Sequence, residues 1–435
     1  MPELLRDYHY EVVVLGGGPA GVAAACVAAE SGCRVALLES TPWLGGPLWR
    51  TLPDVPAPRD ARVWLDRLSR STVEVFDQTT AFAATNPDVL HAERGDEALH
   101  IGWNKLILAT GAQERFLPFP GWTLPNVFGM GGLQLLAKTG WPAAGRRVVV
   151  AGSGPLAFAA AAYLARSGAT VTDIVDQTSW RALFGFALGL PWLAPAKLLQ
   201  AAGFKWHLMH TRFRAGCWVT AAEGNAKLER VTLTDGKRTW QRECDYLACA
   251  YGLVSNLQWP RYLGCAVEQD ALGHDAVVVD PYQCTSVANV YCAGEVAGIA
   301  GIDAALVAGQ IAGYAAAGKN KSAERLFSAR TRGQRFANSL AHAFRLRPEL
   351  FSLATDSTIV CRCEDVTWGE IQACSDFRSA KLHSRCGMGT CQGRVCHTAL
   401  RQLKGWSGEV PRPPLHPVRV GALAGAANAL EAARR

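Results

Sequence analysis

Residues 10–39 read YEVVVLGGGPAGVAAACVAAESGCRVALLE, and this stretch decides the fold. The β-branched apolar run 10–15 predicts a strand, residues 16–21 a glycine-rich turn, and residues 19–31 a helix. A second apolar strand is expected at 34–39. In this order the turn lies at the N-terminus of a helix, where backbone N–H groups and the helix dipole attract phosphate. The stretch therefore predicts a nucleotide-binding β-α-β unit in an α/β domain.

The glycine turn and the acid that closes the unit fit the dinucleotide fingerprint G-x-G-x-x-G. Gly16 permits the tight turn, Gly18 lets the backbone approach a pyrophosphate, and Gly21 lets the helix pack closely on the sheet. Glu39 ends the second strand, where it can accept hydrogen bonds from an adenosine ribose. The predicted nucleotide contacts of this first loop are Gly16, Gly18, Pro19, Ala20, Gly21 and Glu39.

A second unit of the same kind is predicted over residues 146–176, with strands at 147–151 and 169–175 and an alanine-rich helix between them. An acid at its end favours a free ribose 2′-hydroxyl, so NAD or another adenine nucleotide such as ATP or ADP fits better than NADP. Three uses remain open: hydride transfer with NAD(H), a structural nucleotide, or a vacant site. The predicted contacts of this second loop are Gly152, Gly154, Pro155 and Asp176.

Six of the 14 cysteines lie between residues 361 and 396. Four of them form two close pairs, one spaced C-x-C and one C-x4-C, which suits zinc or an iron–sulfur cluster. Glycines at 387, 389 and 393 would bring backbone N–H groups near the sulfurs. Cys374 and Cys386 are expected to be spectators, although Cys386 is near enough in sequence to substitute. The predicted metal ligands are Cys361, Cys363, Cys391 and Cys396.

Length and composition limit the class of protein. A chain of 435 residues, with 49% apolar and 19% charged residues, is expected to form two or three globular domains. From residue 378 to the end there are ten Lys or Arg and two acids. No nucleic-acid recognition motif accompanies this charge, so a buried anionic centre or an acidic partner explains it better than nucleic acid.

Two uncharged 18-residue windows, 12–29 and 148–165, have the length of a membrane span. Each is interrupted near its start by Gly-x-Gly-Pro, which predicts a strand, turn and helix in place of one long helix. No basic segment or cleavage site precedes the first window, so neither a signal peptide nor a span is predicted. Clustered cysteines in a long chain without a leader are typical of the reducing cytoplasm.

Further segments carry a resemblance to a family. Residues 16–21 with Glu39 and Leu44-Gly45-Gly46, then Ala109-Thr110-Gly111, and finally residues 285–295 together resemble the two-dinucleotide-binding flavoproteins. The resemblance covers roughly residues 8–318 and implies two interleaved Rossmann-like domains that bind FAD, with a plain adenine nucleotide at the first loop as the alternative. The family more often has Asp where this chain has Glu295. The alternative interpretation of Glu295 is an acid that is favoured at a helix N-terminus by the helix dipole. The contacts that the resemblance adds are Gly46, Thr110, Gly111, Gly294 and Glu295.

The cysteine region resembles a second family. Residues 360–367 and 387–396 are similar to the [2Fe–2S] module of the bacterioferritin-associated ferredoxin type. This resemblance implies that the four predicted ligands hold one [2Fe–2S] cluster, with zinc as the alternative.

Over nearly its whole length the chain resembles the large α subunit of heteromeric FAD/[2Fe–2S] dehydrogenases of amino acids and opines. That group includes opine oxidases, D-hydroxyproline dehydrogenase and the hydrogen cyanide synthase flavoprotein. Residues 116–125 and 146–156 carry much of the likeness. The resemblance implies an electron relay that serves a partner, an FAD-dependent β subunit similar to amino-acid oxidases, which oxidises a C–N bond. It also admits an FMN at the subunit interface and a small ferredoxin-like subunit.

The predicted organisation follows from these motifs. An FAD-binding domain takes residues 1–114 and 253–318, a second dinucleotide domain 115–252, a helical connector 319–357, and a [2Fe–2S] domain 358–405. The tail 406–435 contains Pro-Arg-Pro-Pro at 411–414 and is expected to be extended and to dock on a partner. No set of catalytic residues is identified. Two other functions stay open: a self-sufficient NAD(H)-dependent reductase and a non-enzymatic iron–sulfur carrier.

Overall fold

The computed structural model describes residues 5–50, 57–85, 88–193, 208–269, 273–406 and 411–426. The chain forms two units, and the second is inserted into the first. Unit 1 comprises Met1–Gln113, Ser255–Ala337 and Val410–Arg435, and unit 2 comprises Glu114–Val254 and Asn338–Glu409. Helix α11 (Phe327–Ala343) begins in unit 1 and ends in unit 2.

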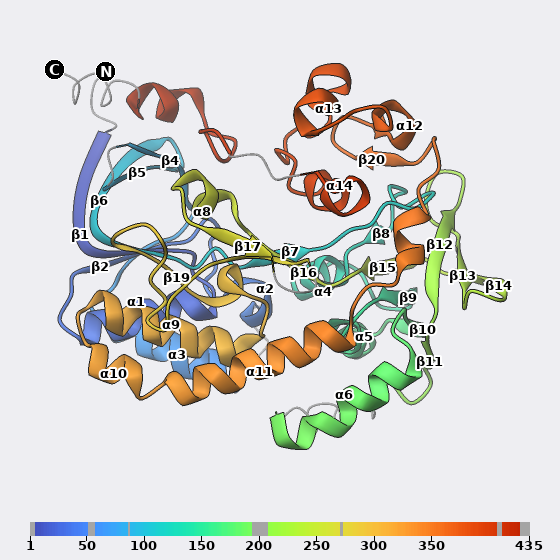
Figure 1. Ribbon diagram of the computed structural model, residues 1–435, viewed down its shortest axis with the longest axis horizontal. Helices are drawn as coiled ribbons and strands as arrows, with labels where there is room; N and C mark the ends of the chain where they lie inside the picture. Colours follow the sequence, from blue (N-terminus) through green and yellow to red (C-terminus); the bar gives the residue numbers. More distant parts are fainter. Residues whose placement is uncertain are drawn as a thin grey trace. The chain divides into compact units, whose positions relative to one another are not determined.

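Unit 1 is built on a seven-stranded sheet in the order β3-β2-β1-β6-β5-β4, with β19 also paired to β6 (Figure 1). Neighbouring strands among β1, β2, β3, β6 and β19 are parallel, and β5 is antiparallel to β4 and β6. Val12, Val13 and Val14 are fully buried, because a parallel sheet is covered on both faces. The strands are β1 (Leu5–Leu15), β2 (Val35–Leu38), β3 (Glu74–Phe76), β4 (Thr79–Thr85), β5 (Val89–Arg94), β6 (Glu97–Leu108) and β19 (Val290–Cys292).

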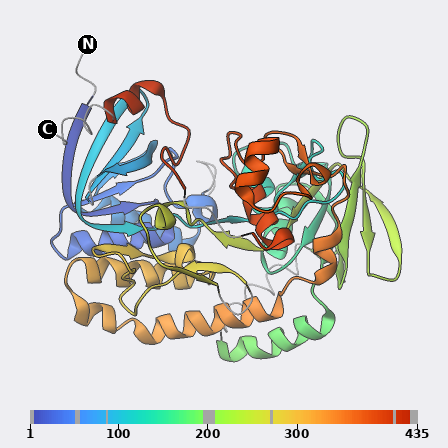
Figure 2. The same ribbon diagram turned by 45° about the horizontal axis from the view of Figure 1, so that its top comes forward.

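Helices α1 and α9 lie side by side against this sheet, as Figures 1 and 2 show. Small residues make this close packing possible: a Cβ on Gly309 would lie only 2.1 Å from the carbonyl oxygen of Ala20. The helical elements of the unit before α11 are α1 (Pro19–Glu30), α2 (Gly46–Trp49), α3 (Arg59–Ser69), α8 (Gln258–Tyr262), η1 (Gly294–Ala297), α9 (Ile302–Ala316) and α10 (Asn320–Glu324). Strand β17 (Val267–Gln269) pairs with β18 (Asp275–Val277), and β7 (Ala112–Glu114) pairs with β16 (Leu253–Ser255).

Unit 2 repeats the plan with a five-stranded parallel sheet in the order β11-β10-β9-β15-β8, beside an antiparallel sheet of β12, β13 and β14. The second glycine turn connects β9 to α5, as the sequence predicts. The strands are β8 (Val127–Phe128), β9 (Arg147–Gly152), β10 (Thr170–Asp176), β11 (Arg212–Ala215), β12 (Trp218–Glu223), β13 (Arg230–Thr234), β14 (Thr239–Glu243) and β15 (Tyr246–Ala250). The helices are α4 (Met130–Lys138), α5 (Leu156–Arg166) and α6 (Trp180–Leu193).

The cysteine region also lies in unit 2 and has a small core of its own, in which Cys361, Cys386 and Cys396 are buried with Phe377 and Trp406. A capping box in which Thr367 and Glu370 bond reciprocally starts its first helix. Its elements, after η2 (Pro348–Ser352), are β20 (Ile359–Cys361), β21 (Val366–Thr367), α12 (Trp368–Ile371), α13 (Phe377–Ser384) and α14 (Cys396–Lys404).

The described part of the C-terminal tail, residues 411–426, folds back onto unit 1, where Figure 2 shows it beside β4, β5 and β6. The Leu415 backbone N–H donates to the Phe82 carbonyl at 2.7 Å, and the Leu415 side chain is 4% exposed. Ala422 belongs to the same buried cluster as Phe82. Residues 412–414 keep the exposure that the sequence predicts, but the rest of this segment is anchored on the chain itself because it carries apolar side chains at the right spacing to cover the sheet.

The two apolar windows are resolved as β1 followed by α1, and as β9 followed by α5. No helix in the described ranges has both the length and the apolar character that crossing a membrane requires.

Candidate functional site: two nucleotide loops and a thiol cluster

The first glycine loop leaves open space above its central glycine. The backbone of Gly16 has a φ of +112°, and a Cβ there would lie 2.4 Å from the carbonyl oxygen of Ala109, so only glycine fits. By contrast, a Cβ on Gly18 would meet no atom within 4 Å. The fingerprint places an incoming pyrophosphate at this second glycine. The loop therefore has the shape and the exposed backbone that a phosphate group needs.

The Glu39 side chain is hydrogen-bonded to the backbone of this loop. Its carboxylate accepts hydrogen bonds from Gly17 N–H at 2.9 Å, Thr41 N–H at 2.8 Å and the Thr41 hydroxyl at 2.9 Å, and the residue is 9% exposed. A further segment approaches from the side, since Gly45 N–H donates to the Gly17 carbonyl at 2.7 Å and a Cβ on Gly46 would be 3.6 Å from the Gly18 Cα. The structure thus brings Glu39 and Gly46 to the first loop.

The returning strand and the second flavoprotein segment are held together by residues that sequence reasoning missed. Asn256 donates from its side chain to the Thr110 carbonyl at 2.8 Å and from its backbone to the Gly111 carbonyl at 3.0 Å. Ser255 donates to the Glu295 carbonyl at 2.6 Å. No local motif marks these two residues, because their partners lie about 40 to 146 positions away in the sequence.

Glu295 is the second residue of the 3-10 turn η1, which begins at Gly294. A Cβ on Gly294 would lie 2.7 Å from the Cβ of Ala20, so this turn abuts the start of α1. Burial raises the pKa of the Glu295 carboxyl. The first loop, Gly294 and Glu295 therefore belong to one region of unit 1.

The second loop follows the same order of strand, turn and helix, but its backbone differs. Gly154 has a φ of +97° where Gly18 has −73°, and α5 begins one fingerprint position later than α1 does. The Asp176 carboxylate is fully buried and accepts hydrogen bonds from Gly154 N–H at 3.2 Å and Thr178 N–H at 2.8 Å. Burial raises the pKa of Asp176 to about 6, against the lowering effect of the bonds from Thr178 and Gly154. Ser153 and Gln177 are also buried, at 3% and 2% exposure. These polar side chains are therefore not presented to solvent in the way that a ribose contact requires.

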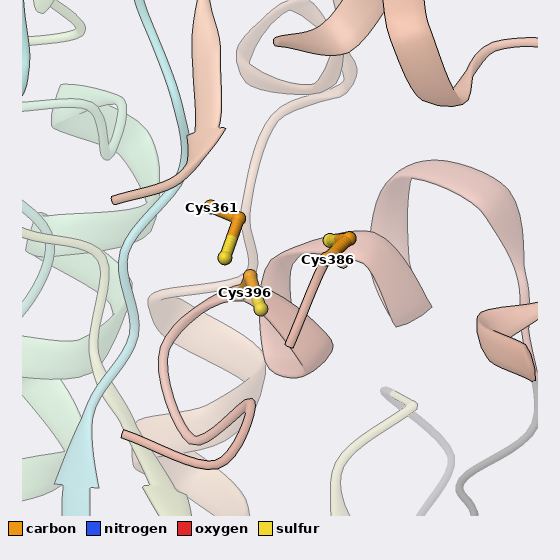
Figure 3. Close-up of side chains that lie close together, drawn as sticks. All are labelled: Cys361, Cys386 and Cys396. Carbon is orange, nitrogen blue, oxygen red and sulfur yellow. The ribbon is translucent and has the colours of Figure 1, made fainter. Parts of the chain in front are cut away.

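The cysteine region gathers three thiols in one place (Figure 3). The sulfur atoms of Cys361, Cys386 and Cys396 all lie within 4.8 Å of one another, and all three residues are buried. Hydrogen bonds from the Cys386 and Cys396 thiols lower the pKa of Cys361, so the thiolate is favoured there. The Gly387 N–H points at the Cys361 sulfur at 3.4 Å. This arrangement of thiols and N–H donors is suited to soft metal ions or iron–sulfur clusters.

The two other predicted ligands form a pair of their own. Cys363 is exposed and Cys391 half-buried, and burial raises the pKa of Cys391, with a smaller contribution from a hydrogen bond between its thiol and that of Cys363. Backbone N–H groups of Val395 and Gly393 also bond to Cys391. The four predicted ligands therefore lie in two groups, Cys361 and Cys396 together with Cys386, and Cys363 with Cys391, and each group takes one of the predicted ligands from each sequence motif.

Cys386 was expected to be a spectator, and the structure places it in contact with Cys361 and Cys396. A hydrogen bond to Cys361 raises the pKa of Cys386 to about 12, with burial adding to the effect. The sequence signal was its position directly before Gly387, on the same loop that approaches Cys361.

Known proteins share this architecture. The family model of the pyridine nucleotide-disulphide oxidoreductases matches residues 10–312, which is more than half of the chain. The chain belongs to that family. It is therefore a flavin-dependent oxidoreductase, as the sequence predicts. The C-x-x-C dithiol that disulfide-reducing enzymes use does not occur in this sequence.

The similarity extends beyond the family model. A subunit of opine oxidase from Rhizobium meliloti is 30% identical over 95% of this chain and 98% of its own length. The hydrogen cyanide synthase subunit HcnB of Pseudomonas protegens is also 30% identical, over 93% and 96%. A crystal structure of L-proline dehydrogenase from P. horikoshii shares the fold, with a TM-score of 0.68, 21% identity, and coverage of 97% of this chain and 80% of that one. The predicted resemblance to subunits of heteromeric flavin dehydrogenases is confirmed.

Proposed function

We propose that this chain is the electron-relay subunit of a heteromeric dehydrogenase whose partner, an FAD-dependent β subunit, oxidises a C–N bond of an amino acid or an opine. The observation that carries the proposal is the clustering of thiols in unit 2. It is combined, in the same chain, with an open nucleotide loop in unit 1. An enzyme that needed only a flavin and a nicotinamide would have no use for five clustered cysteines. Both full-length relatives are named as subunits, which supports a partner.

The first loop fits FAD. Gly18 offers uncovered backbone for the pyrophosphate, and the start of α1, which has no side-chain cap, faces it with the N–H groups of its first turn. Glu39 lies beside the ribose position, while Thr110, Gly111 and the turn at Gly294 and Glu295 would border the rest of the cofactor. A bound flavin supplies exchange of electrons in ones or twos.

The two thiol pairs fit a [2Fe–2S] cluster, in which each iron takes two protein ligands. Cys361 with Cys396 and Cys363 with Cys391 would each hold one iron. The Gly387 N–H on the Cys361 sulfur would stabilise negative charge on the cluster. Such a cluster supplies one-electron transfer. Zinc would need four ligands in one compact tetrahedron, and among the described residues only three thiols lie that close together, those of Cys361, Cys386 and Cys396.

The cluster assignment has a direct test. Serine at Cys361, Cys363, Cys391 or Cys396 is expected to abolish or shift the EPR signal of the reduced protein. Cys386→Ser is expected to keep the signal, because the pair that it touches already has two thiols and the iron held by Cys363 and Cys391 would gain nothing from it. Cys249→Ser, at a buried cysteine of β15, is the matched control. Loss of the signal in Cys386→Ser alone would contradict these ligands.

The resemblance to heteromeric dehydrogenases also admits further parts of the assembly. An FMN at the subunit interface and a small ferredoxin-like subunit would extend the relay. The 14 cysteines are all free in the structure, which fits the reducing cytoplasm as the compartment.

The relay itself is tested by reconstitution. The purified chain is expected to reduce no dye when amino acids or opines are supplied, since no substrate-oxidising residues are identified in it. Addition of its cognate flavoprotein subunit is expected to restore dye reduction. In the complex, Cys396→Ser should leave flavin reduction in the partner intact and stop transfer to the dye. Robust amino-acid oxidation by the chain alone would overturn the proposal and place the active site here.

A further inference from the structure

A short segment of the chain lies across the second nucleotide loop. It consists of residues 344–347, which follow α11 directly and belong to unit 2. The Ser153 hydroxyl donates to the Phe344 carbonyl at 3.4 Å. The Gln177 side chain uses both ends of its amide: its NH₂ group donates to the Arg345 carbonyl at 3.1 Å, and its oxygen accepts from the Arg347 N–H at 3.1 Å.

These contacts occupy the place of a nucleotide. Ser153 is the middle residue of the Gly-Ser-Gly turn, and Gln177 follows the acid that would bind ribose. A Cβ on Gly154 would be 4.0 Å from the ring of Phe344, whereas the same position on Gly18 in the first loop is free of atoms within 4 Å. The Phe344 ring therefore lies beside Gly154, the glycine at which the fingerprint places an incoming pyrophosphate.

The segment is also anchored on its far side. The Arg347 guanidinium lies over the Trp218 ring at 4.0 Å from its centroid and donates to the Gly216 carbonyl at 3.2 Å. The Phe344 ring contacts Phe186 on α6, with centroids 5.3 Å apart, and Leu346 packs against the buried core beside Trp218. Opening the loop would require these contacts and the two Gln177 bonds to break together.

We propose that residues 344–347 are a built-in plug that excludes adenine dinucleotides from the second nucleotide loop. Electrons then neither enter nor leave this chain through NAD(H), although its sequence carries the complete fingerprint. The proposal rests on the contacts of the plug alone and holds whether or not the chain relays electrons.

Photolabelling with 8-azido-NAD tests the plug in the full-length protein, with labelled peptides identified by mass spectrometry. The wild-type chain is expected to show no label on residues 152–178. The double variant Gln177→Ala, Phe344→Ala is expected to gain label there by at least tenfold. Phe351→Ala is the matched control, because Phe351 is another partly buried phenylalanine of the same unit and lies outside residues 344–347. Equal labelling of wild type and double variant, or none in either, would overturn the proposal.

A second measurement keeps the proposal testable if the double variant does not fold. Amide hydrogen exchange of wild-type protein should show a slow Arg347 N–H, since it is bonded to Gln177, and 1 mM NADH should leave it slow. Fast exchange at Arg347 would show that the plug is not seated and would overturn the proposal. Neither readout involves electron transfer, so failure of the relay function and failure of the plug are distinguishable.

Discussion

The two glycine loops share one fingerprint and differ in what covers them. Residues 16–21 and 152–157 each follow a buried parallel strand, open a helix, and have an acid from the neighbouring strand bonded beneath the turn. Above Gly18 there is free space, and above Gly154 lies the ring of Phe344. Glu39 keeps 9% of its surface exposed and Asp176 none.

This difference shows what a fingerprint specifies. Glycines and a terminal acid specify the order of strand, turn and helix, but not every backbone angle, since Gly18 has a φ of −73° and Gly154 one of +97°. They do not determine access, which depends on residues that reach the loop from far along the chain. In this protein the first loop is open to a ligand, and the second is covered by residues 344–347 of the same chain.

The largest effect on the free energy of unfolding is expected at the third glycine position of the fingerprint. This position is Gly21 in the first loop and Ala157 in the second. A Cβ on Gly21 would lie 1.8 Å from the carbonyl oxygen of Gly16, so the helix or the turn must move. Gly21→Ala is expected to lower the free energy of unfolding by about 3 kcal/mol or more. Urea denaturation of nucleotide-free protein measures it. Gly18→Ala is the control, as its Cβ has open space; equal effects of the two changes would contradict the packing argument.

An effect of similar size is expected at the second loop, where Asp176 makes the free energy of unfolding depend on pH. Buried Asp176 has its pKa raised to about 6 from an ordinary value of 3.8, so the native protein holds a proton that the unfolded chain releases. The stability that Asp176 contributes is fully present below pH 3.8 and is lost as pH rises through about 6. The change amounts to about 3 kcal/mol over this range.

Asp176→Asn removes this titration. The free energy of unfolding of the wild type, relative to that of the variant, is expected to fall as pH rises from about 4 to about 7. The substitution itself also changes stability, but that cost is the same at every pH and does not affect the trend. Urea denaturation at several pH values measures the difference. A difference that stays constant with pH would show that Asp176 is ionised and solvated, and would remove one contrast between the two loops.

The next effect concerns nucleotide at the first loop. Gly18→Val would place a branched side chain in the space that the pyrophosphate needs, so bound flavin or adenine nucleotide is expected to weaken by on the order of a hundredfold, about 2.8 kcal/mol. Release of nucleotide on denaturation, quantified by chromatography, measures occupancy. Gly185→Val on α6, also with no atom near its Cβ, should retain full occupancy. Full retention in Gly18→Val would move the cofactor away from this loop.

Much of the fold could be predicted because its signals are local. In both β-α-β units the strand, turn and helix follow in the predicted order, and the helix expected at 19–31 is α1, Pro19–Glu30. The first strand was predicted five residues short, since Leu5–His9 is not a continuous apolar run and is held by pairing with β6. The four predicted ligands were recognisable because they lie in two compact motifs, but their grouping across the motifs and the contact of Cys386 with Cys361 and Cys396 appear only in the structure.

The features that sequence reasoning missed depend on contacts between distant residues. Gln177 and Arg345 are 168 positions apart, and Ser153 and Phe344 are 191 apart. Arg419 of the tail bonds to Glu93, 326 positions away. No period or spacing in a single sequence encodes such pairs. The plug and the folded-back tail therefore appear only in three dimensions, although their residues look ordinary in the sequence.

The smallest effect is expected for the opposite substitution, alanine to glycine, at the third position of the second loop. Ala157 is fully buried at the start of α5, so the second loop already accommodates the Cβ that the first loop excludes. Ala157→Gly is expected to cost about 1 kcal/mol, from the lower helix propensity of glycine and the loss of one buried methyl group. Urea denaturation beside Gly21→Ala compares the two directly. If Ala157→Gly cost as much as Gly21→Ala, the third position would have the same packing demand in both loops. A small cost would instead show that helix α5 sits slightly farther from its strand than α1 does.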